Sequence, residues 1–360
     1  MKGIFILLLT VIFCPTLIAQ TTIRAGADFK AKGIMSTRGG ISNGSDKTDL
    51  TLAHIILTGT NQTLSTTSPL TVQGLTIEGG GTKTIQGDVT VSRDLLLTQG
   101  ILTAGTGRIL YTGTTPLSGT ATSYVNGILF QRGTGTRFFP VGSGSTYLPM
   151  SLNNIEDGSA EIGVSGFTAG VNLSLPSDLS ALAGNRHWQV DVRGGTFRAS
   201  SASLYVPGSS VDASPRMVVV EADAGGGTAL NLGGGITGDF VTSFNPATRP
   251  ILTIGIAEKV DLRIMDLITP FTADNINDRL KILNIEYTYE NKVTLLDRWG
   301  VTVHEWSNFR NYDDPSATGN DNYDFTKLSP GNYICVLEYK LSADSPREKL
   351  NQMITVLKGN

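Results

Sequence analysis

The first third of the chain has short runs in which apolar and polar residues alternate, separated by glycine, asparagine and threonine. The runs are 70–72, 75–77, 89–91, 95–97, 101–102 and 109–111. Alternation with a period of two puts one side of each run into a core and the other into solvent, which is typical of a β-strand. Helix patterns are almost absent. The pattern therefore predicts an all-β fold.

The spacing of these runs indicates how the strands are connected. Three successive runs begin at residues 89, 95 and 101, six residues apart. Short, evenly spaced strands favour a β-solenoid, in which each strand stacks on the next coil. We predict a solenoid-like region at residues 20–118, with the clearest pattern at 40–118. An antiparallel meander gives a similar pattern and stays the alternative.

Between residues 119 and 257 the runs are longer and contain proline. They lie at 124–127, 137–142, 187–192, 217–221 and 251–255. These runs predict a β-sandwich-like region. Its first part contains Val-Asn-Gly at 125–127, Phe-Pro-Val-Gly at 139–142 and Tyr-Leu-Pro at 147–149, followed by Trp188. This order resembles a module common in cell-surface proteins of Bacteroidota, and the resemblance implies no activity.

The last hundred residues continue the strand pattern. Apolar runs at 293–296 and 301–303 flank an Asp-Arg-Trp-Gly segment, and a Pro-Gly turn opens the run 333–339. In that last run the odd-numbered residues, Tyr333 to Tyr339, share one face, so we predict a largely buried strand with Cys335 as a small packing residue. About seven strands fit this length, as an Ig-like antiparallel β-sandwich.

Composition separates this tail from the rest of the chain. Only four of the 42 glycines lie beyond residue 258, whereas 26 of the 59 charged residues lie in the last hundred positions. We therefore predict a domain boundary near residue 258 and a separately folded tail at 261–360. The formal net charge is only −3, which gives no indication of a nucleic-acid partner.

The first nineteen residues have the layout of a secretory signal peptide. A basic start at Met1-Lys2 precedes an apolar stretch at 4–13, a proline at position 15 and a small residue, Ala19. The stretch is too short to span a bilayer. Its removal would leave Cys335 as the single cysteine, so the mature chain cannot form an internal disulfide.

The tail motifs, in their order, resemble the gliding motility-associated C-terminal domain family, the type B sorting domain of type IX secretion. That family opens with T-P-N-G-D-G-I-N-D, has F-N-R-W-G in mid-domain and then L-P-x-G-T-Y. The matching positions of this chain include Thr269, Ile276 and Leu328 and the ten candidate site residues Pro270, Asp274, Asn277, Asp278, Arg298, Trp299, Gly300, Pro330, Gly331 and Tyr333.

Two departures from the family pattern stand out. Asn275 replaces a glycine, and a polar loop at 312–324 replaces the family's W-D-G element. The resemblance implies that the domain addresses the chain to the type IX outer-membrane machinery, and that the protein reaches the cell surface or the medium through the periplasm.

The candidate residues also have structural interpretations. Trp299 follows an apolar run, so we predict that it packs inside the tail; a surface cation–π pair with Arg298 is the alternative. Asp274, Asn277 and Asp278 have oxygen ligands for Ca²⁺, but they lack the spacing of an EF-hand loop, and turn capping explains them equally well. We therefore expect no metal and no cofactor.

Enzymatic patterns are weak throughout the chain. His54, His187 and His304 are isolated from other metal-ligand residues, and no nucleophile elbow or phosphate loop occurs. Asp88, Arg93 and Asp94 form the one charged cluster of the solenoid region, at turns where charged residues are expected. We predict no catalytic residues.

These observations predict a non-catalytic exported protein with an adhesin or matrix role for its body. Surface polysaccharide or other surface proteins are the partners considered for that role, besides the secretion machinery. The alternative function is a carbohydrate-binding or glycan-active solenoid. An exposed row of aromatics and carboxylates on one face of the solenoid would favour that alternative, and the sequence has only Tyr111 and Tyr124 near that region.

Overall fold

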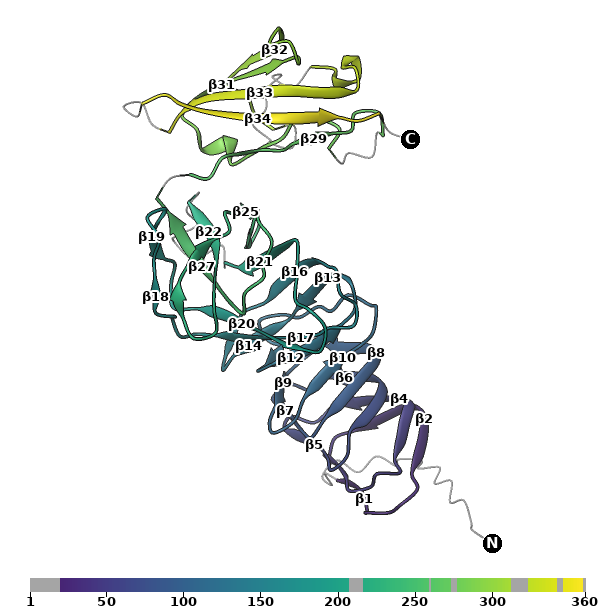
Figure 1. The fold of residues 1–360 in the computed structure, drawn as a ribbon. Helices are drawn as coiled ribbons and strands as arrows, with labels where there is room; N and C mark the ends of the chain where they lie inside the picture. Colours follow the sequence, from purple (N-terminus) through teal and green to yellow (C-terminus); the bar gives the residue numbers. More distant parts are fainter. Residues whose placement is uncertain are drawn as a thin grey trace. The chain divides into compact units, whose positions relative to one another are not determined.

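A computed structural model describes residues 20–206, 216–258, 260–272, 277–311, 323–341 and 346–358. The segment interpreted as a signal peptide, residues 1–19, lies outside this range. The described elements are strands and two 3-10 turns (Figure 1), so the all-β prediction is confirmed. One compact unit comprises residues up to 168 together with 188–199, and the other comprises 169–187 and the chain from 200 onward.

The first unit contains two parallel ladders that wind together as a solenoid. The long ladder has, in order, β2 (Lys30–Thr37), β4 (Asp49–Leu57), β6 (Leu70–Ile77), β8 (Val89–Leu97), β10 (Ile109–Tyr111) and β12 (Leu129–Arg132). The short ladder has β1 (Thr21–Ile23), β3 (Ile41–Asn43), β5 (Gln62–Thr66), β7 (Thr82–Gln86), β9 (Ile101–Ala104) and β11 (Val125–Asn126). Each coil supplies one strand to each ladder. The solenoid prediction is confirmed, and the pairing is not that of a meander.

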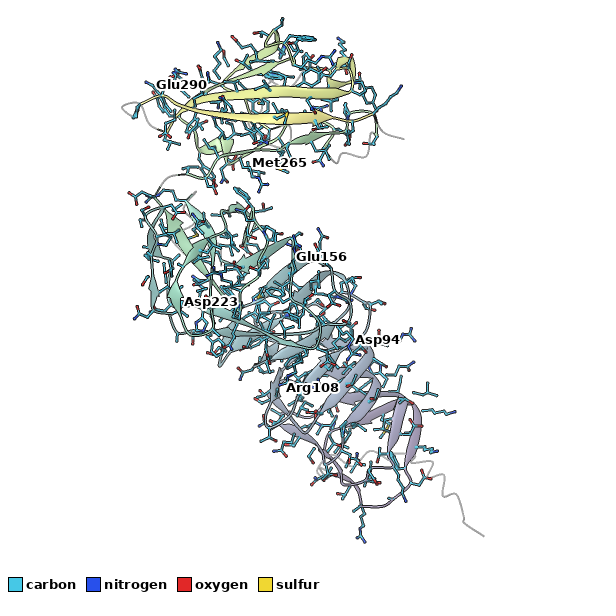
Figure 2. The ribbon with its side chains drawn as sticks, in the orientation of Figure 1. Asp94, Arg108, Glu156, Asp223, Met265 and Glu290 are labelled. Carbon is cyan, nitrogen blue, oxygen red and sulfur yellow. The ribbon has the colours of Figure 1, made fainter. Side chains whose placement is uncertain are left out.

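The period of the solenoid differs from the six-residue spacing in the sequence. Ile55 pairs with Leu75, and Leu75 pairs with Leu95, so these coils repeat every twenty residues. The runs at 89–91 and 95–97 both belong to the single strand β8. The register between β6 and β8 shifts just beyond Val72, and this irregularity interrupts the apolar alternation of β8 between the two runs. Asp94 lies on β8 just after this shift (Figure 2). One irregular strand therefore looked like two strands in the sequence.

Close stacking of the coils determines which residues fit at the corners. Gly79 has a φ of +73°, and a Cβ at this position would overlap the carbonyl oxygen of Thr58 in the preceding coil. Gly80, the next residue, has a φ of +70°, but a Cβ added there would have the Gln99 side-chain amide as its nearest neighbour, 4.0 Å away. The corner at Gly79 thus excludes every other side chain by space as well as by backbone conformation.

Two buried polar side chains bond to the backbone at the same corner of successive coils. Gln62 accepts a hydrogen bond from the Gly59 N–H at 2.6 Å and donates to the Gly39 carbonyl at 2.6 Å. Lys83, its register partner in the next coil, donates to the Gly80 carbonyl. Burial lowers the pKa of the Lys83 ammonium. Both side chains satisfy turn carbonyls inside the fold, as buried polar groups must.

Six strands close the far end of the solenoid. They are β13 (Gly135–Phe139), β14 (Val141–Ser143), β15 (Thr146–Tyr147), β16 (Met150–Ile155), β17 (Glu161–Phe167) and β20 (His187–Arg193). β14 extends the short ladder by pairing with β11 in parallel, whereas β13 with β16, β14 with β15 and β17 with β12 pair antiparallel. The Tyr124 hydroxyl donates to the Gly144 carbonyl at 2.7 Å, and the Asn126 side chain accepts from the Gly144 N–H at 3.0 Å. The fully buried Trp188 donates to the Leu148 carbonyl at 2.8 Å. The Val-Asn-Gly, Phe-Pro-Val-Gly and Tyr-Leu-Pro motifs therefore build the closing segment of the solenoid.

The second unit begins with short strands and ends with the tail. Its first strands are β18 (Leu173–Ser174), β19 (Leu179–Leu182), β21 (Ser201–Tyr205), β22 (Met217–Ala222), β23 (Gly227–Thr228), β24 (Leu230–Asn231), β25 (Gly235–Thr237), β26 (Phe240–Thr242) and β27 (Ile251–Ala257). The tail has β28 (Arg263–Ile264), β29 (Leu267–Ile268), β30 (Ile282–Leu283), η1 (Ile285–Tyr287), β31 (Glu290–Leu296), β32 (Thr302–Ser307), η2 (Phe325–Lys327), β33 (Gly331–Lys340) and β34 (Glu348–Val356).

The tail strands form a five-stranded sheet in the order β29-β34-β33-β31-β32 and a two-stranded sheet of β28 and β30. The described tail thus has the seven strands expected, although β29 pairs with β34 in parallel. On β33 the side chains of Tyr333, Cys335 and Leu337 are buried, whereas Ile334 faces solvent. The predicted alternation is confirmed, but only one face of this strand is fully buried.

Gly79→Ala should destabilise the solenoid unit more than Gly80→Ala. Both substitutions force a left-handed alanine, at about 1–2 kcal/mol, and the overlap at position 79 should add about 1–3 kcal/mol. Calorimetric melting of the two variants measures the difference. Equal melting temperatures would show that the coils separate easily at this corner.

Candidate functional site

The Arg-Trp-Gly motif forms the tip of the hairpin between β31 and β32. Leu296 pairs with Thr302, which closes the loop 297–301. The Asp297 carboxylate accepts hydrogen bonds from the backbone N–H groups of Trp299 and Val301, both at 2.9 Å. Gly300, with a φ of +82°, donates its N–H to the Asp297 carbonyl at 3.0 Å. One carboxylate and one glycine therefore fix the conformation of the tip.

Trp299 is on the surface, with 77% of its area exposed, so the prediction that it packs in the core is wrong. The guanidinium carbon of Arg298 lies 5.1 Å from the centroid of its ring, which is the cation–π pair considered as the alternative. Trp299 is exposed because it lies in the middle of the five-residue loop 297–301 and not on a strand. The strand alternation ends at Leu296, so the following residues point away from the sheet core whatever their hydrophobicity.

The tryptophan that fills the core of the tail is Trp306, on the return strand β32. It pairs in register with the buried Val293 and is only 4% exposed. Its ring contacts those of Phe309 at 5.7 Å and Phe325 at 6.1 Å between centroids. The sequence could have identified Trp306 as a core residue through the alternation of inward and outward positions on β32. That assignment requires the register of β32 against β31, which depends on the length of the hairpin loop.

In the opening motif, residues 269–272 and 277–278 are joined by hydrogen bonds. Pro270 is buried, and the Thr269 N–H donates to the Asn277 carbonyl at 2.7 Å. Asn277 has a φ of +58°, in the left-handed region that asparagine tolerates. The Thr272 hydroxyl donates to the Asp278 carboxylate at 3.1 Å, as in a capped turn. Asp274, the fourth candidate residue of this motif, lies outside the described residues.

The third motif opens the longest strand of the tail. Pro330 and Gly331 are exposed, and Gly331 has a φ of +147° at the start of β33. The buried Tyr333 donates its hydroxyl to the Ser329 carbonyl at 2.9 Å, which ties the turn to the strand.

Strand register brings the three motifs to the same end of the tail sheet. Leu296, at the end of β31, pairs with Ile334 near the start of β33. Val356, at the end of β34, pairs with both Gly331 and Ile268. The hairpin tip, the Pro-Gly turn and the opening loop all emerge where these strands end. We call this end of the sheet the tip end.

Residues 262–356 match the CHU_C type IX secretion signal domain family. The resemblance to a type IX sorting domain is therefore confirmed over almost the whole tail. The chain is a cargo directed to type IX secretion, and its tail is the part that interacts with that machinery. No curated protein and no solved structure matches the chain.

Reactive side chains elsewhere are engaged in structural contacts. Cys335 is buried, and desolvation raises the pKa of its thiol to about 12, which leaves little reactive thiolate at neutral pH. The His54 ring bonds to the Thr76 hydroxyl at 2.7 Å. Within the described ranges no three His, Cys, Asp or Glu side chains gather as a metal site would require. The same residues contain no helix long and apolar enough to span a membrane.

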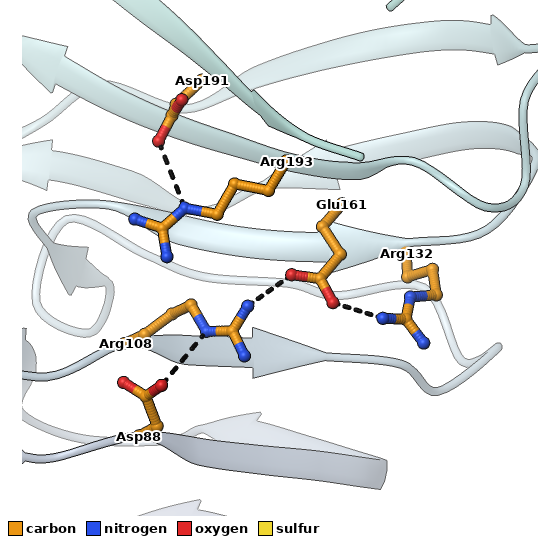
Figure 3. Close-up of polar contacts among 6 residues, drawn as sticks. All are labelled: Asp88, Arg108, Arg132, Glu161, Asp191 and Arg193. Carbon is orange, nitrogen blue, oxygen red and sulfur yellow. Dashed lines mark hydrogen bonds and ion pairs between the residues drawn. The ribbon is translucent and has the colours of Figure 1, made fainter. Parts of the chain in front are cut away.

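A cluster of charged residues covers the junction between the solenoid and its closing strands (Figure 3). The Glu161 carboxylate accepts hydrogen bonds from Arg108 and from Arg132, its register partner across β12 and β17. Arg108 Nε lies 3.8 Å from Asp88, and Arg193 stands over the buried Phe130 ring at 4.6 Å. Arg108 and Arg132 share the carboxylate of Glu161, although the buried Nε of Arg108 makes no hydrogen bond. These ion pairs link the last solenoid strands to the closing strand β17 and stabilise the junction.

The features considered for glycan chemistry have other roles in the fold. Tyr111 and Tyr124 are completely buried, and the Tyr111 hydroxyl donates to the Thr115 carbonyl at 2.7 Å. Arg93 lies 3.5 Å from Asp94, while Asp88 belongs to the junction cluster. Within the described residues, all large aromatic side chains classed as exposed are in the tail.

The positions of the two tail tryptophans predict opposite effects on stability. Trp306→Ala should destabilise the tail by about 3–5 kcal/mol, because it empties the aromatic core. Trp299→Ala should change the free energy of unfolding by less than about 0.5 kcal/mol, because its side chain makes few contacts within the fold. Thermal melts of the full chain measure both, and similar losses for both variants would contradict the assignment of Trp306 as the core residue.

Glu161→Gln should destabilise the first unit by about 2 kcal/mol, since it leaves Arg108 without its main counter-charge in a site where Glu161 is only 12% exposed. Glu156→Gln, at an exposed ion pair with Arg198, is the control and should be nearly neutral. Chemical denaturation measures the two. An unchanged midpoint for Glu161→Gln would mean that the cluster does not hold the junction.

Proposed function

We propose that the protein is a non-catalytic cell-surface or secreted protein whose tail carries it out of the cell and whose solenoid body has an adhesin or matrix role. The route runs through the periplasm, with an N-terminal signal peptide for the first membrane and the tail for the second. The observation that carries this proposal is the match of residues 262–356 to a type IX secretion signal domain.

The contacts of the body support a structural role. Two of its carboxylates bind other parts of the fold: Glu161 accepts hydrogen bonds from two arginines, and the Asp157 carboxylate accepts from the backbone N–H groups of Ser159 and Thr196 at 2.8 Å each. These hydrogen bonds lower the pKa of Asp157 to about 2, so it is ionised and engaged at neutral pH. Surface polysaccharide or another surface protein is the partner expected for such a body.

The alternative is a carbohydrate-binding or glycan-active solenoid, and the two aromatic residues considered for it are buried. Protein sites for sugars stack aromatic faces on the ligand, and Tyr111 and Tyr124 contribute no surface. The exposed large apolar residues of the solenoid are aliphatic: Ile34, Leu52 and Leu96. No specific observation favours the alternative over the structural role.

Deletion of residues 261–360 should leave the remaining chain in the periplasm of a bacterium that has the type IX machinery. The measurement is protease accessibility on intact cells, compared with periplasmic extracts, for the full and truncated chains. Limited proteolysis of the truncated chain serves as the control that the body still folds. Normal surface levels of the truncated chain would refute the sorting role.

A further inference from the structure

Among the described residues of the tail, most of the exposed large apolar side chains lie at the tip end of its sheet, and the exceptions are Tyr287 and Tyr289. Trp299 and Val301 belong to the hairpin tip, and Phe271 belongs to the opening loop. Ile334 and Met353 are register partners on the outer face of β33 and β34, beside Leu296 of β31. Leu357 follows the end of β34, where its N–H donates to the Ile268 carbonyl at 3.0 Å. We call the exposed members the apolar tip: Phe271, Trp299, Val301, Ile334, Met353 and Leu357.

The outer face of the same sheet is charged away from this end. Lys292 lies 2.9 Å from Glu305, and Lys349 lies 3.7 Å from Glu338. At the opposite end Glu290, labelled in Figure 2, pairs with Arg347. These cross-strand ion pairs are ordinary solvent-facing contacts. The contrast makes the apolar tip a distinct patch, and exposed apolar patches with a polar border mark interaction sites.

Trp299, the most exposed residue of the patch, is held in place before any partner binds. The Asp297 carboxylate fixes the backbone of Trp299 and Val301, and the Arg298 guanidinium stacks on the Trp299 ring. A preordered tryptophan loses little conformational freedom on binding, and tryptophan and arginine, together with tyrosine, are enriched at the energetic centres of interfaces.

We propose that the apolar tip is the surface by which the type IX secretion machinery binds the folded tail. The inference rests on the proposed sorting function and specifies where that function is located. The partner it fits is a folded protein component with an apolar pocket for the Trp299 ring and a carboxylate opposite Arg298. Two observations favour this occupant: the matched signal domain includes every residue of the patch except Leu357, and the three family motifs border it.

The test compares variants of the full chain in a bacterium that has the type IX machinery. Trp299→Ala and Met353→Asp remove apolar contact at the tip. Tyr289→Ala is the matched control for Trp299, because this tyrosine is also strongly exposed, at 63%, but next to the opposite end of the sheet. Asn351→Asp is the control for Met353, since it adds the same charge to the same face of β34, two residues away.

The expected result is a surface-exposed fraction lowered roughly tenfold or more for the two tip variants, as for loss of an interface centre, with folded protein in the periplasm. The two controls should be exported like the wild type. Thermal melts of the purified variants check the fold. If the melting temperature of Met353→Asp is well below that of the wild type, the comparison uses Met353→Ser instead. Its control is then Asn351→Ser.

Normal export of both tip variants would overturn the inference, as would equal retention of tip and control variants. The truncation of 261–360, run in the same cells, separates this failure from failure of the sorting function: a retained truncation with exported tip variants refutes only the location. The apolar tip could instead bind a second copy of this chain, and light scattering tests this by measuring the molar mass of the wild type and of Trp299→Ala in solution. A wild-type dimer that Trp299→Ala converts to monomer without loss of export would assign the patch to self-association and overturn the proposal.

Discussion

The stacking of one coil directly on the next is the constraint on which the first unit depends. Among the described residues, each inner strand of the two ladders bonds its backbone to the strand of the coil before and to the strand of the coil after. Neighbouring coils therefore lie one strand spacing apart. This proximity excludes a side chain at Gly79 and brings Gln62 and Lys83 inside to satisfy turn carbonyls. The glycine at position 79 is therefore a requirement of this packing.

A parallel ladder has two open edges, and the two ends of this one differ. At the C-terminal end β17 pairs antiparallel with β12, and the Arg108–Glu161–Arg132 contacts bridge that change of direction. At the other end β2 is the last strand of its ladder among the described residues. It has Lys30 and Lys32 beside a register shift, and Gly33 has a φ of +79°. Charges and irregular backbone of this kind discourage a further strand from adding to the edge.

Much of this architecture could be predicted from local patterns, because alternation and turn residues are local properties. The strands, the solenoid and the alternating face of β33 were all predictable in this way. The coil period was not, since the shift beyond Val72 depends on pairing with β8. The junction cluster was equally hidden, because Asp88, Arg108 and Glu161 are far apart in sequence. Choosing between Trp299 and Trp306 for the core required the length of the loop between two strands, which hydrophobicity does not reveal.

The same dependence on register bears on how the tail can act as a signal. Its three motifs are separated by about thirty residues each, and they meet only because β31, β33, β34 and β29 end at the same place. A receptor that binds them together therefore recognises a folded domain and not a linear peptide. Stability alone gives no reason for the hairpin to present Trp299 at 77% exposure while Trp306 fills the core. The fold uses one tryptophan for its interior and leaves the other, held by Asp297 and Arg298, for contact outside the chain.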